Sequence, residues 1–315
     1  MDLSSLQYHT DTLEPGTPEV ALLRRDAASL LVQLDHKENL QTEKVLPLKA
    51  GMWNALFHLE PAGLVAKLSP YSNQFETNFL RVAEKQQVKV PRVISEGALE
   101  HPDLPGAAYF LMTYIPECIN PYPLLVSGKL AGKVRLQLAD DLGSELAKLH
   151  RHHLGYITHF GQPVKSWKEA ITHPLFSPNW DEIVPKGFYQ GELLKKFQHI
   201  LQESGYLDFT DGSLCHTDLS LNNVLVHENS LELQAIIDPA GFAGMPMFDL
   251  AYTAMPWEIG FDFMDRLINS YQRQGGKLDP VYFKISLMVI AYQHVRFHTA
   301  AVKAAILEVI HEICL

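Results

Sequence analysis

The chain has 315 residues but only three cysteines and no long apolar run. Cys118, Cys215 and Cys314 lie far apart and show no CxxC spacing. We interpret them as reduced thiols, which excludes a disulfide framework and a cysteine metal site. No stretch reaches the roughly 18 uninterrupted apolar residues that a membrane helix needs. The acidic N-terminus lacks the basic and apolar segments of a signal peptide, so we expect a soluble, cytoplasmic protein.

Basic residues are also scarce, because 26 Lys and Arg stand against 36 Asp and Glu, giving a formal net charge of −10. This balance excludes a broad nucleic-acid-binding surface, which needs a basic face. The deficit is concentrated between Phe197 and Asp265, where eleven acidic residues occur without a single Lys or Arg. A solvated acidic face or a charged site would each produce such a stretch. The hydrophobic content of 47% excludes a mainly disordered chain.

The order of the predicted elements indicates two parts. In the first part, apolar alternation and Gly/Pro turns predict a small antiparallel sheet with helices. Its predicted strands are 45–48, 53–59, 64–68, 88–94 and 107–114, and its helices are 17–33 and 73–85. Three prolines between Pro116 and Pro123 predict a hinge. Beyond the hinge helices dominate, at 133–153, 166–171, 191–202, 261–274 and 282–310, with one inserted β-hairpin at 224–227 and 233–238.

This hairpin carries the residues that are able to do chemistry. His216, Asp218 and Asn223 precede its first strand in H-x-D-x4-N spacing, which is typical of a phosphotransferase catalytic loop. The second strand ends at Asp238, fifteen residues after Asn223. A two-stranded hairpin of this length returns the chain to its start, so we expect Asp238 to lie within a few ångströms of Asn223.

The same residues predict a metal site and a general base. One carboxylate from Asp238 and one amide oxygen from Asn223 suit Mg²⁺, which takes few protein ligands together with substrate phosphates. Asp218 is then free to accept the proton of an attacking hydroxyl. We expect His216 to orient the loop rather than to titrate. The alternative is ordinary turn chemistry, because Asp and Asn cap many loops; the flanking strands and the terminal Asp238 favour the site.

A nucleotide also needs a cationic contact. Lys67 lies near the end of a predicted strand, and Glu76 follows nine residues later on a predicted helix. A lysine held by a helix glutamate over the nucleotide phosphates is the pair expected in a kinase-like site. On spacing alone, an ordinary surface lysine and glutamate are equally consistent. Of a phosphate-covering loop only Gly51 is present, and no Walker A motif occurs, which excludes a P-loop enzyme.

Together these residues resemble a known family, the aminoglycoside phosphotransferase and choline kinase-like enzymes, relatives of the protein kinases that include the fructosamine kinases. The similarity covers nearly the whole chain. Its strongest part is Ile237-Asp238-Pro239-Ala240 followed by Gly244-Met245-Pro246-Met247-Phe248-Asp249-Leu250-Ala251, which looks like the metal-binding aspartate and the G-x-P-x-x-D-L-A segment of the family. The family usually has glycine where Thr217 stands.

The resemblance implies an α+β, bilobal protein kinase-like fold with a small antiparallel-sheet N-lobe and a larger, mainly helical C-lobe. Residues 1–115 would form the nucleotide-binding lobe and residues 116–315 the catalytic and substrate-binding lobe. By resemblance, the base is Asp218, the Mg²⁺ ligands are Asn223 and Asp238, the ATP-binding residues are Lys67, Glu76, Gly51, Met112, Tyr114 and Ile115, and the supports of the catalytic loop are His216 and Asp249.

We therefore expect an ATP- and Mg²⁺-dependent kinase that transfers the γ-phosphoryl group to a hydroxyl of a small molecule. The acidic stretch favours a cationic acceptor, such as an aminoglycoside-like antibiotic, another amino-sugar or an amino-alcohol. Glu258, Asp262 and Asp265 are the candidate contacts, although solvated helix acids would look the same.

Two alternatives stay open. The first is a fructosamine or ketoamine kinase, which Asp238-Pro239-Ala240 favours, whereas Ser220 stands where those enzymes usually carry tryptophan. The second is an inactive kinase-like protein that only binds nucleotide. We expect no nucleic-acid or membrane partner, and both a monomer and a homodimer are consistent with the sequence.

Overall fold

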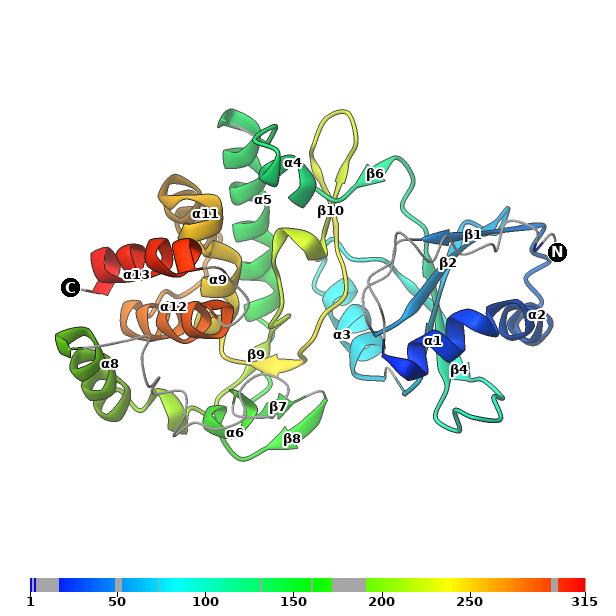
Figure 1. Cartoon of the computed structure of the whole chain (residues 1–315), viewed down its shortest axis with the longest axis horizontal. Coiled ribbons are helices and arrows are strands. Elements are labelled where there is room, and N and C mark those ends of the chain that lie inside the picture. Colours follow the sequence, from blue (N-terminus) through cyan, green and yellow to red (C-terminus); the bar gives the residue numbers. More distant parts are fainter. Residues whose placement is uncertain are drawn as a thin grey trace. The chain divides into compact units, whose positions relative to one another are not determined.

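The computed structural model describes residues 1, 3, 17–48, 53–72, 74–130, 132–159, 161–171, 191–295 and 300–314. They form two compact units (Figure 1). The first unit comprises Met1–Arg81 and Pro91–Pro116, and the second comprises Val82–Val90 and Glu117–Leu315. Within the described ranges, no helix is long and apolar enough to cross a membrane.

A five-stranded antiparallel sheet forms the centre of the first unit, in the order β1-β2-β3-β5-β4. The turn between β2 and β3 contains Gly63 at φ +63°, a left-handed conformation that glycine adopts without steric cost. The strands are β1 (Lys44–Leu48), β2 (Ala55–Glu60), β3 (Leu64–Ser69), β4 (Val93–Ala98) and β5 (Ala108–Thr113).

Two helices pack on one face of this sheet. Helix α1 (Pro18–Arg25) begins after Thr17, whose hydroxyl accepts a hydrogen bond from the Val20 amide at 3.4 Å. The sequence predicts one continuous helix over 17–33, but the chain breaks at Asp26 and continues as α2 (Ala27–Glu38). Buried apolar residues of both helices and of the sheet form one core, which includes Leu23, Leu30, Leu31, Leu34, Phe57, Ala66, Leu68 and Leu111.

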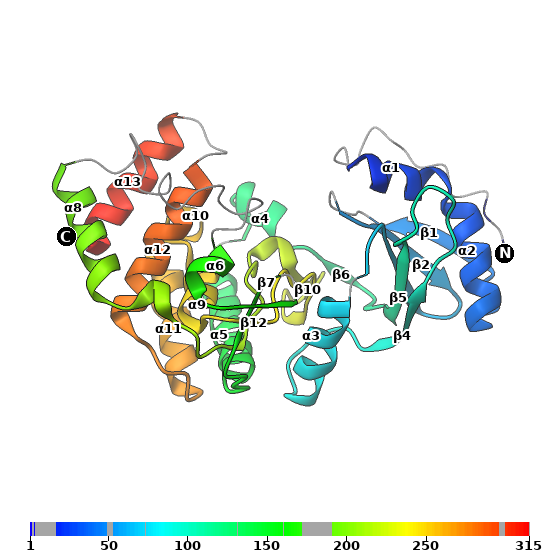
Figure 2. The same ribbon diagram turned by 90° about the horizontal axis from the view of Figure 1, so that it is seen from below.

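Helix α3 (Gln74–Lys85) lies on the opposite face of the sheet (Figure 2). Side chains alternate between the two faces along a strand. Ala66 and Leu68 of β3 belong to the core under α1 and α2. Lys67, between them, therefore points to the other face, where it meets Glu76 of α3. The alternation along β3 thus selects which residue faces α3.

Strand β4 begins later than the sequence predicts, because the expected strand 88–94 contains Pro91. Proline cannot donate to a strand ladder, and the preceding segment also turns at Gln87, which has φ +57°. The strand starts only at Val93 and extends to Ala98.

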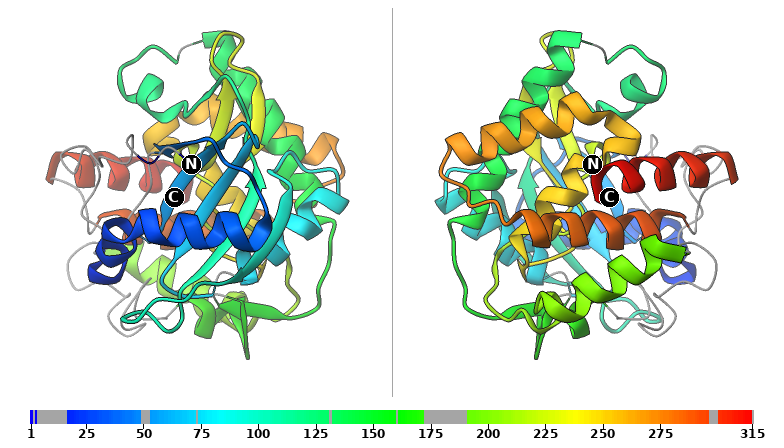
Figure 3. Two further views of the ribbon diagram at one scale, coloured as in Figure 1. Left: turned by 90° about the vertical axis from the view of Figure 1, so that its right-hand side faces the viewer. Right: turned by 90° about the vertical axis from the view of Figure 1, so that its left-hand side faces the viewer.

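The second unit is mainly helical. Helix α11 (Phe261–Arg273) packs along α5 (Gly132–His150), and α12 (Pro280–Val295) packs on α9 (Pro246–Ala254). Figure 3 (right) shows α13 (Ala300–Cys314), in red, beside α12. The sequence predicts one helix over 282–310, whereas the structure has α12 and α13, and residues 296–299 lie outside its described part. The other described α-helices of this unit are α4 (Tyr122–Val126), α6 (Trp167–Ile171), α8 (Gly191–Glu203) and α10 (Pro256–Ile259).

The predicted hairpin is present as β10 (Val224–His227) and β11 (Leu233–Ile236), which pair in antiparallel fashion. A third strand, β6 (Cys118–Ile119), pairs with the free edge of β10 and was not anticipated within the proline-rich hinge. Two further pairs complete the unit: β9 (Ser213–Leu214) with β12 (Ala243–Gly244), and β7 (Ile157–His159) with β8 (Gln162–Val164). These short ladders hold the loop at 215–223 between helices.

Candidate active site

The segment at 215–223, which precedes β10 and is here called the hairpin loop, brings its polar residues close together. The Ile237 amide donates a hydrogen bond to the Asn223 carbonyl at 3.0 Å. The residue before Asp238 therefore lies against Asn223, as the length of the hairpin predicts. Ser220 begins the short 3₁₀ turn Leu221–Asn223 by accepting a hydrogen bond from the Asn222 amide at 3.3 Å. This turn presents the Asn223 side chain to Asp218.

Asp218 is half-buried and held on two sides. The Asn223 amide group donates to its Oδ2 at 3.0 Å and to its carbonyl at 2.7 Å, and the Tyr252 hydroxyl donates to its carboxylate. Burial raises the pKa of Asp218, and the negative charge of Asp238 adds to the rise, whereas the bonds from Tyr252 and Asn223 oppose it. A carboxylate with a raised pKa is a better proton acceptor than an exposed one.

The donor set around Asp218 fits a hard divalent cation. The nitrogen of the Asn223 amide is used on Asp218, so its oxygen is the group left to act as a ligand. Asp238 is exposed and has φ +58°. The hydrogen bond from the Ile237 amide to the Asn223 carbonyl places Asp238, the next residue, beside Asn223, and the charge of Asp238 raises the pKa of Asp218. One carboxylate and one amide oxygen beside an open surface match the few oxygen ligands that Mg²⁺ takes from proteins.

Asp249, in the first turn of α9, holds the hairpin loop by accepting hydrogen bonds from its backbone amides. Its Oδ2 accepts a hydrogen bond from the His216 amide and its Oδ1 from the Thr217 amide, both at 2.8 Å. The carboxylate is fully buried. Burial alone would raise its pKa, but the hydrogen bonds from the His150 ring and from the His216 amide hold the pKa of Asp249 below its ordinary value. An ionised Asp249 therefore fixes two successive amides of the loop.

His216 orients the loop with both ring nitrogens. Its Nε2 lies 2.9 Å from the Ile237 carbonyl, and its Nδ1 lies 3.3 Å from the Asp218 amide. A carbonyl only accepts and an amide only donates, so this network assigns the proton to Nε2. The ring is fully buried and ties the loop to the end of β11.

His150, Cys215 and Asp249 are buried together with their ligand atoms within 4.8 Å of one another. Both ring nitrogens of His150 already have partners, since Nε2 lies 3.2 Å from Asp249 and Nδ1 lies 3.0 Å from the Tyr271 hydroxyl. Burial raises the pKa of the Cys215 thiol well above its usual value, which disfavours the thiolate that a metal needs. We interpret the cluster as a hydrogen-bonded support.

In the first unit, Lys67 and Glu76 form a buried ion pair. Lys67 Nζ lies 2.7 Å from Oε1 and 2.9 Å from Oε2 of Glu76. Lys67 is 2% exposed and Glu76 is 4% exposed. This burial excludes the interpretation of the two as ordinary surface residues. The ammonium also lies 5.7 Å from the centre of the Phe110 ring.

Three further predicted nucleotide-binding residues, Met112, Tyr114 and Ile115, lie on or just after β5. Met112 pairs with Val65 of β3, and the Tyr114 amide donates to the Gly63 carbonyl at 2.9 Å. The Tyr114 ring stacks on His58 with ring centres 3.7 Å apart. Ile115 follows, half-buried, outside the strand. Gly51 lies outside the described residues.

A family profile described as "Phosphotransferase enzyme family" matches residues 44–285. The chain belongs to this family. The matched range contains the buried ion pair and the hairpin with its supports. The protein is a small-molecule kinase. No curated protein matches the chain.

Solved structures similar to this phosphotransferase support the same fold. A choline/ethanolamine kinase family protein from Mesorhizobium loti has a TM-score of 0.54 and 15% identity, over 92% of this chain and 93% of that one. A thermostable mutant of aminoglycoside phosphotransferase APH(4)-Ia, in complex with ADP and hygromycin B, has a TM-score of 0.59 and 16% identity, over 90% of this chain and 98% of that one. The predicted α+β, protein kinase-like fold, with an antiparallel sheet first and helices after it, is confirmed.

The three candidate acceptor contacts of the phosphotransferase differ in their surroundings. Glu258 of α10 is half-buried, and its charge contributes to the raised pKa of Tyr252, the residue bonded to Asp218. Asp262 forms an ion pair with Arg135, which offsets its charge. Asp265 is exposed one turn further along α11. Of the three, Glu258 is the one that the structure connects to the hairpin loop.

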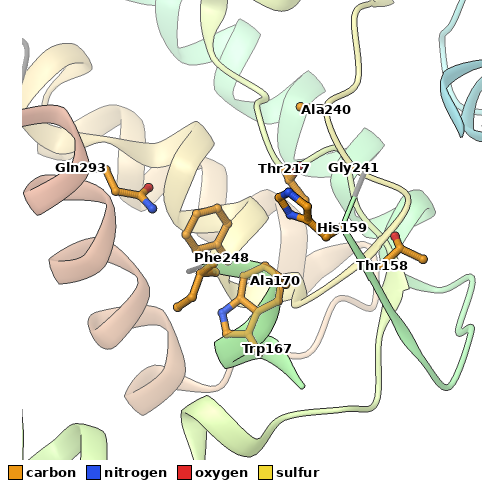
Figure 4. A pocket seen from close by; sticks show the side chains of 10 residues that line it. Thr158, His159, Trp167, Ala170, Thr217, Ala240, Gly241, Phe248 and Gln293 are labelled. Atoms are coloured by element: carbon orange, nitrogen blue, oxygen red, sulfur yellow. The ribbon is translucent and has the colours of Figure 1, made fainter. Parts of the chain in front are cut away.

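A small cavity lies behind the hairpin loop of the phosphotransferase (Figure 4). It has a volume of about 40 Å³, enough for a few water molecules. Thr217 lines it, together with the rings of Trp167 and Phe248, which meet edge to face with centres 5.2 Å apart. The cavity is too small for an acceptor, so we assign these aromatic residues to support of the loop.

Two residues of the site were not anticipated from the sequence. Tyr252 lies three positions after Asp249 on α9. Residues three apart lie on the same side of a helix, so both side chains face the hairpin loop. Tyr271 of α11 completes the contact to His150. The position of Tyr252 directly after the G-x-P-x-x-D-L-A segment was a usable signal, whereas the contact of Tyr271 depends on the packing of α11 on α5.

Proposed function

We propose that the protein transfers the γ-phosphoryl group of ATP to a hydroxyl group of a small cationic molecule, with Asp218 as the general base. The observation that carries this proposal is the convergence of Asp218, Asn223 and Asp238 at the base of one hairpin, with two loop amides fixed by Asp249. Similar solved structures in complex with ADP or GDP support the use of a nucleotide.

The steps follow from the groups that the chain presents. The acceptor hydroxyl gives its proton to Asp218 as its oxygen attacks the γ-phosphorus, and ADP leaves from the opposite side. Lys67, held by Glu76, would bind the phosphates of ATP as a point charge. Asn223 and Asp238 would hold Mg²⁺, which when bound neutralises charge on the transferring phosphates. Positioning supplies most of the rate, because little covalent chemistry is left for the protein.

Charge around the hairpin favours a cationic acceptor. The stretch between Phe197 and Asp265 has eleven acidic residues and no Lys or Arg. Asp218, Asp238 and Asp249 belong to this stretch, and Glu258 lies near Tyr252. Carboxylates of one sign attract a cation and raise its local concentration. A similar solved structure, the GDP and kanamycin complex of an aminoglycoside phosphotransferase, supports an amino-sugar as one such acceptor.

The experiment that tests the proposal uses purified protein with Mg-ATP and a panel of amino-sugars, ketoamines, amino-alcohols and matched neutral polyols. We expect ADP release that depends on the acceptor, a phosphorylated product by mass spectrometry, and a preference for cationic acceptors over neutral ones. Nucleotide binding without transfer to any acceptor, and without slow ATP hydrolysis in their absence, would instead support an inactive nucleotide-binding protein.

A further inference from the structure

A second and larger pocket lies in the second unit. It has a volume of about 530 Å³, within the range of small-molecule sites. The end of α5, the start of α9, the end of α11 and the turn before α12 line it. The residues with proposed catalytic and metal-binding roles, Asp218, Asn223 and Asp238, are not among those that line it.

The lining of the pocket combines apolar side chains with two cations that form no ion pair within the described residues. Met245, Met247 and Phe209 are among its apolar lining residues. Arg151 and Lys277 are exposed at its wall. Neither forms an ion pair with any residue in the described part of the chain, although the Arg151 Nε donates to the carbonyl of Ala147 at 3.2 Å. Two cations and several apolar side chains in one lining suit a molecule with an apolar body and one anionic group.

Both carboxylates that line the pocket have partners other than Arg151 and Lys277. Asp211 lies 3.1 Å from Nε2 of His153. Asp279 accepts hydrogen bonds from the amides of Val281 at 2.9 Å and Tyr282 at 3.0 Å, at the N-terminus of α12. A carboxylate at a helix N-terminus is partly neutralised by the helix dipole. Arg151 and Lys277 therefore remain the groups that a ligand anion would meet.

A chain of hydrogen bonds connects this pocket to the hairpin loop. His150 and Tyr271 both line the pocket, and Tyr271 lies 3.0 Å from Nδ1 of His150. The other ring nitrogen of His150 lies 3.2 Å from Asp249, which accepts the amides of His216 and Thr217 at 2.8 Å. A molecule in the pocket would touch the first two members of this chain. Any shift of the His150 ring changes the hydrogen bonding of Asp249.

We propose that this pocket is a second small-molecule site, which takes an organic anion with an apolar body, and that its occupant alters the hydrogen bonds holding the loop at 216–217. The binding of the anion does not depend on the proposed kinase activity. Only the consequence for phosphoryl transfer rests on that function, because the loop carries Asp218.

Binding is tested with anilinonaphthalene sulfonate, whose fluorescence rises in an apolar site and whose single sulfonate supplies the anion. The measurement is made with saturating Mg-ADP, so that the nucleotide site is blocked. We expect saturable binding that weakens about a hundredfold in Arg151→Gln/Lys277→Gln, because the double variant removes two charge-assisted contacts that are each worth about tenfold in affinity. The control Lys284→Gln, an exposed lysine of α12 that does not line the pocket, should bind as the wild type does. Equal affinity in the double variant and the control would overturn the proposed site.

The connection to the loop is tested by amide hydrogen exchange of the peptide that contains His216 and Thr217, with and without the same probe. We expect the probe to change exchange there by at least severalfold in the wild type and to have no effect in Tyr271→Phe, which lacks the hydroxyl at His150. This readout needs no acceptor and no turnover, so it separates failure of the connection from failure of the proposed kinase activity. Probe binding that leaves exchange at 216–217 unchanged would refute the connection.

Discussion

Thr217 occupies the space that a side chain on Gly241 would need. A Cβ atom at position 241 would lie 2.5 Å from Cγ2 and 2.6 Å from Oγ1 of Thr217. Thr217 itself has φ +63°, a conformation that β-branched residues rarely adopt. Thr217 stands where the family usually has glycine, and the residue that faces it, Gly241, is itself a glycine. The Thr217 amide donates a hydrogen bond to Asp249.

This packing predicts a strong dependence between the two positions. Gly241→Ala in the wild type should destabilise the fold by about 1–3 kcal/mol through overcrowding. In a Thr217→Gly background the same change should cost at least about 1 kcal/mol less, since only the Cys215 carbonyl, 3.1 Å from the new Cβ, still opposes it. Urea unfolding of the four proteins measures the difference. Gly106→Ala, whose new Cβ would meet Pro70 instead, serves as the control, and additive effects at 217 and 241 would contradict the packing argument.

Tyr252 should control the pH dependence of transfer. Its hydrogen bond lowers the pKa of Asp218, which burial raises. Asp218 must be ionised to accept a proton, so the rate falls as the pH drops below this pKa. Tyr252→Phe removes the opposing bond, and the acid limb of the kcat/KM profile should therefore move to higher pH. Tyr109→Phe, which loses a hydroxyl bonded to Glu38 in the first unit, should leave the limb in place.

The buried ion pair of the first unit should respond in a non-additive way. Lys67→Met leaves the carboxylate of Glu76 buried without its partner, which should cost about 3–5 kcal/mol of stability. The double variant Lys67→Met/Glu76→Met removes both charges and should recover most of that loss, while remaining unable to bind ATP phosphates through residue 67. Removing the exposed pair Lys195–Glu192 should cost under about 1 kcal/mol. Equal destabilisation in the single and double variants at 67 and 76 would argue against the pair.

A substitution at Gly276 tests whether the contact of Tyr271 with His150 supports the hairpin loop. A Cβ at position 276 would lie 2.4 Å from Cε1 of Tyr271, so Gly276→Ala should displace the ring and weaken its bond to His150. We expect faster amide exchange at 216–217 and a kcat lowered about tenfold, the effect of roughly 1.4 kcal/mol. Gly275→Ala meets no atom within 4 Å but adds a side chain at φ +87°. It should lower stability by about 1 kcal/mol and leave kcat unchanged.

The sequence predicts well those elements whose local signals all favour the same secondary structure. Strand β3 and helix α3 begin and end within a residue of their expected bounds, because alternation, turns and helical spacing agree there. The predicted bounds of strand β4 were wrong, because the prediction gave more weight to the apolar residues at 88–94 than to Pro91, which cannot donate to a strand ladder. Strand β6 is two residues long and exists only because β10 offers an edge at Val226 and His227. No local pattern contains that information.

Some residues of the candidate site could likewise be predicted from the sequence, whereas others could not. The H-x-D-x4-N spacing and the hairpin length were sufficient to bring Asp218, Asn223 and Asp238 together. Lys67 and Glu76 were ambiguous, since spacing does not report burial, and the structure shows them 2% and 4% exposed. Tyr271 could not be found, because its bond to His150 depends on how α11 packs against α5.

The most direct measurement is the rate of transfer of labelled γ-phosphate from ATP to the best acceptor of the panel, in the wild type and in Asp218→Asn. Asp208→Asn, an exposed residue outside the hairpin, is the matched control. Because a general base contributes about 10²–10⁴ in rate, Asp218→Asn should lower kcat by at least about a hundredfold while nucleotide affinity and Tm stay near the wild-type values. An Asp218→Asn protein that transfers phosphate as fast as the wild type would contradict the assignment of Asp218 as the base.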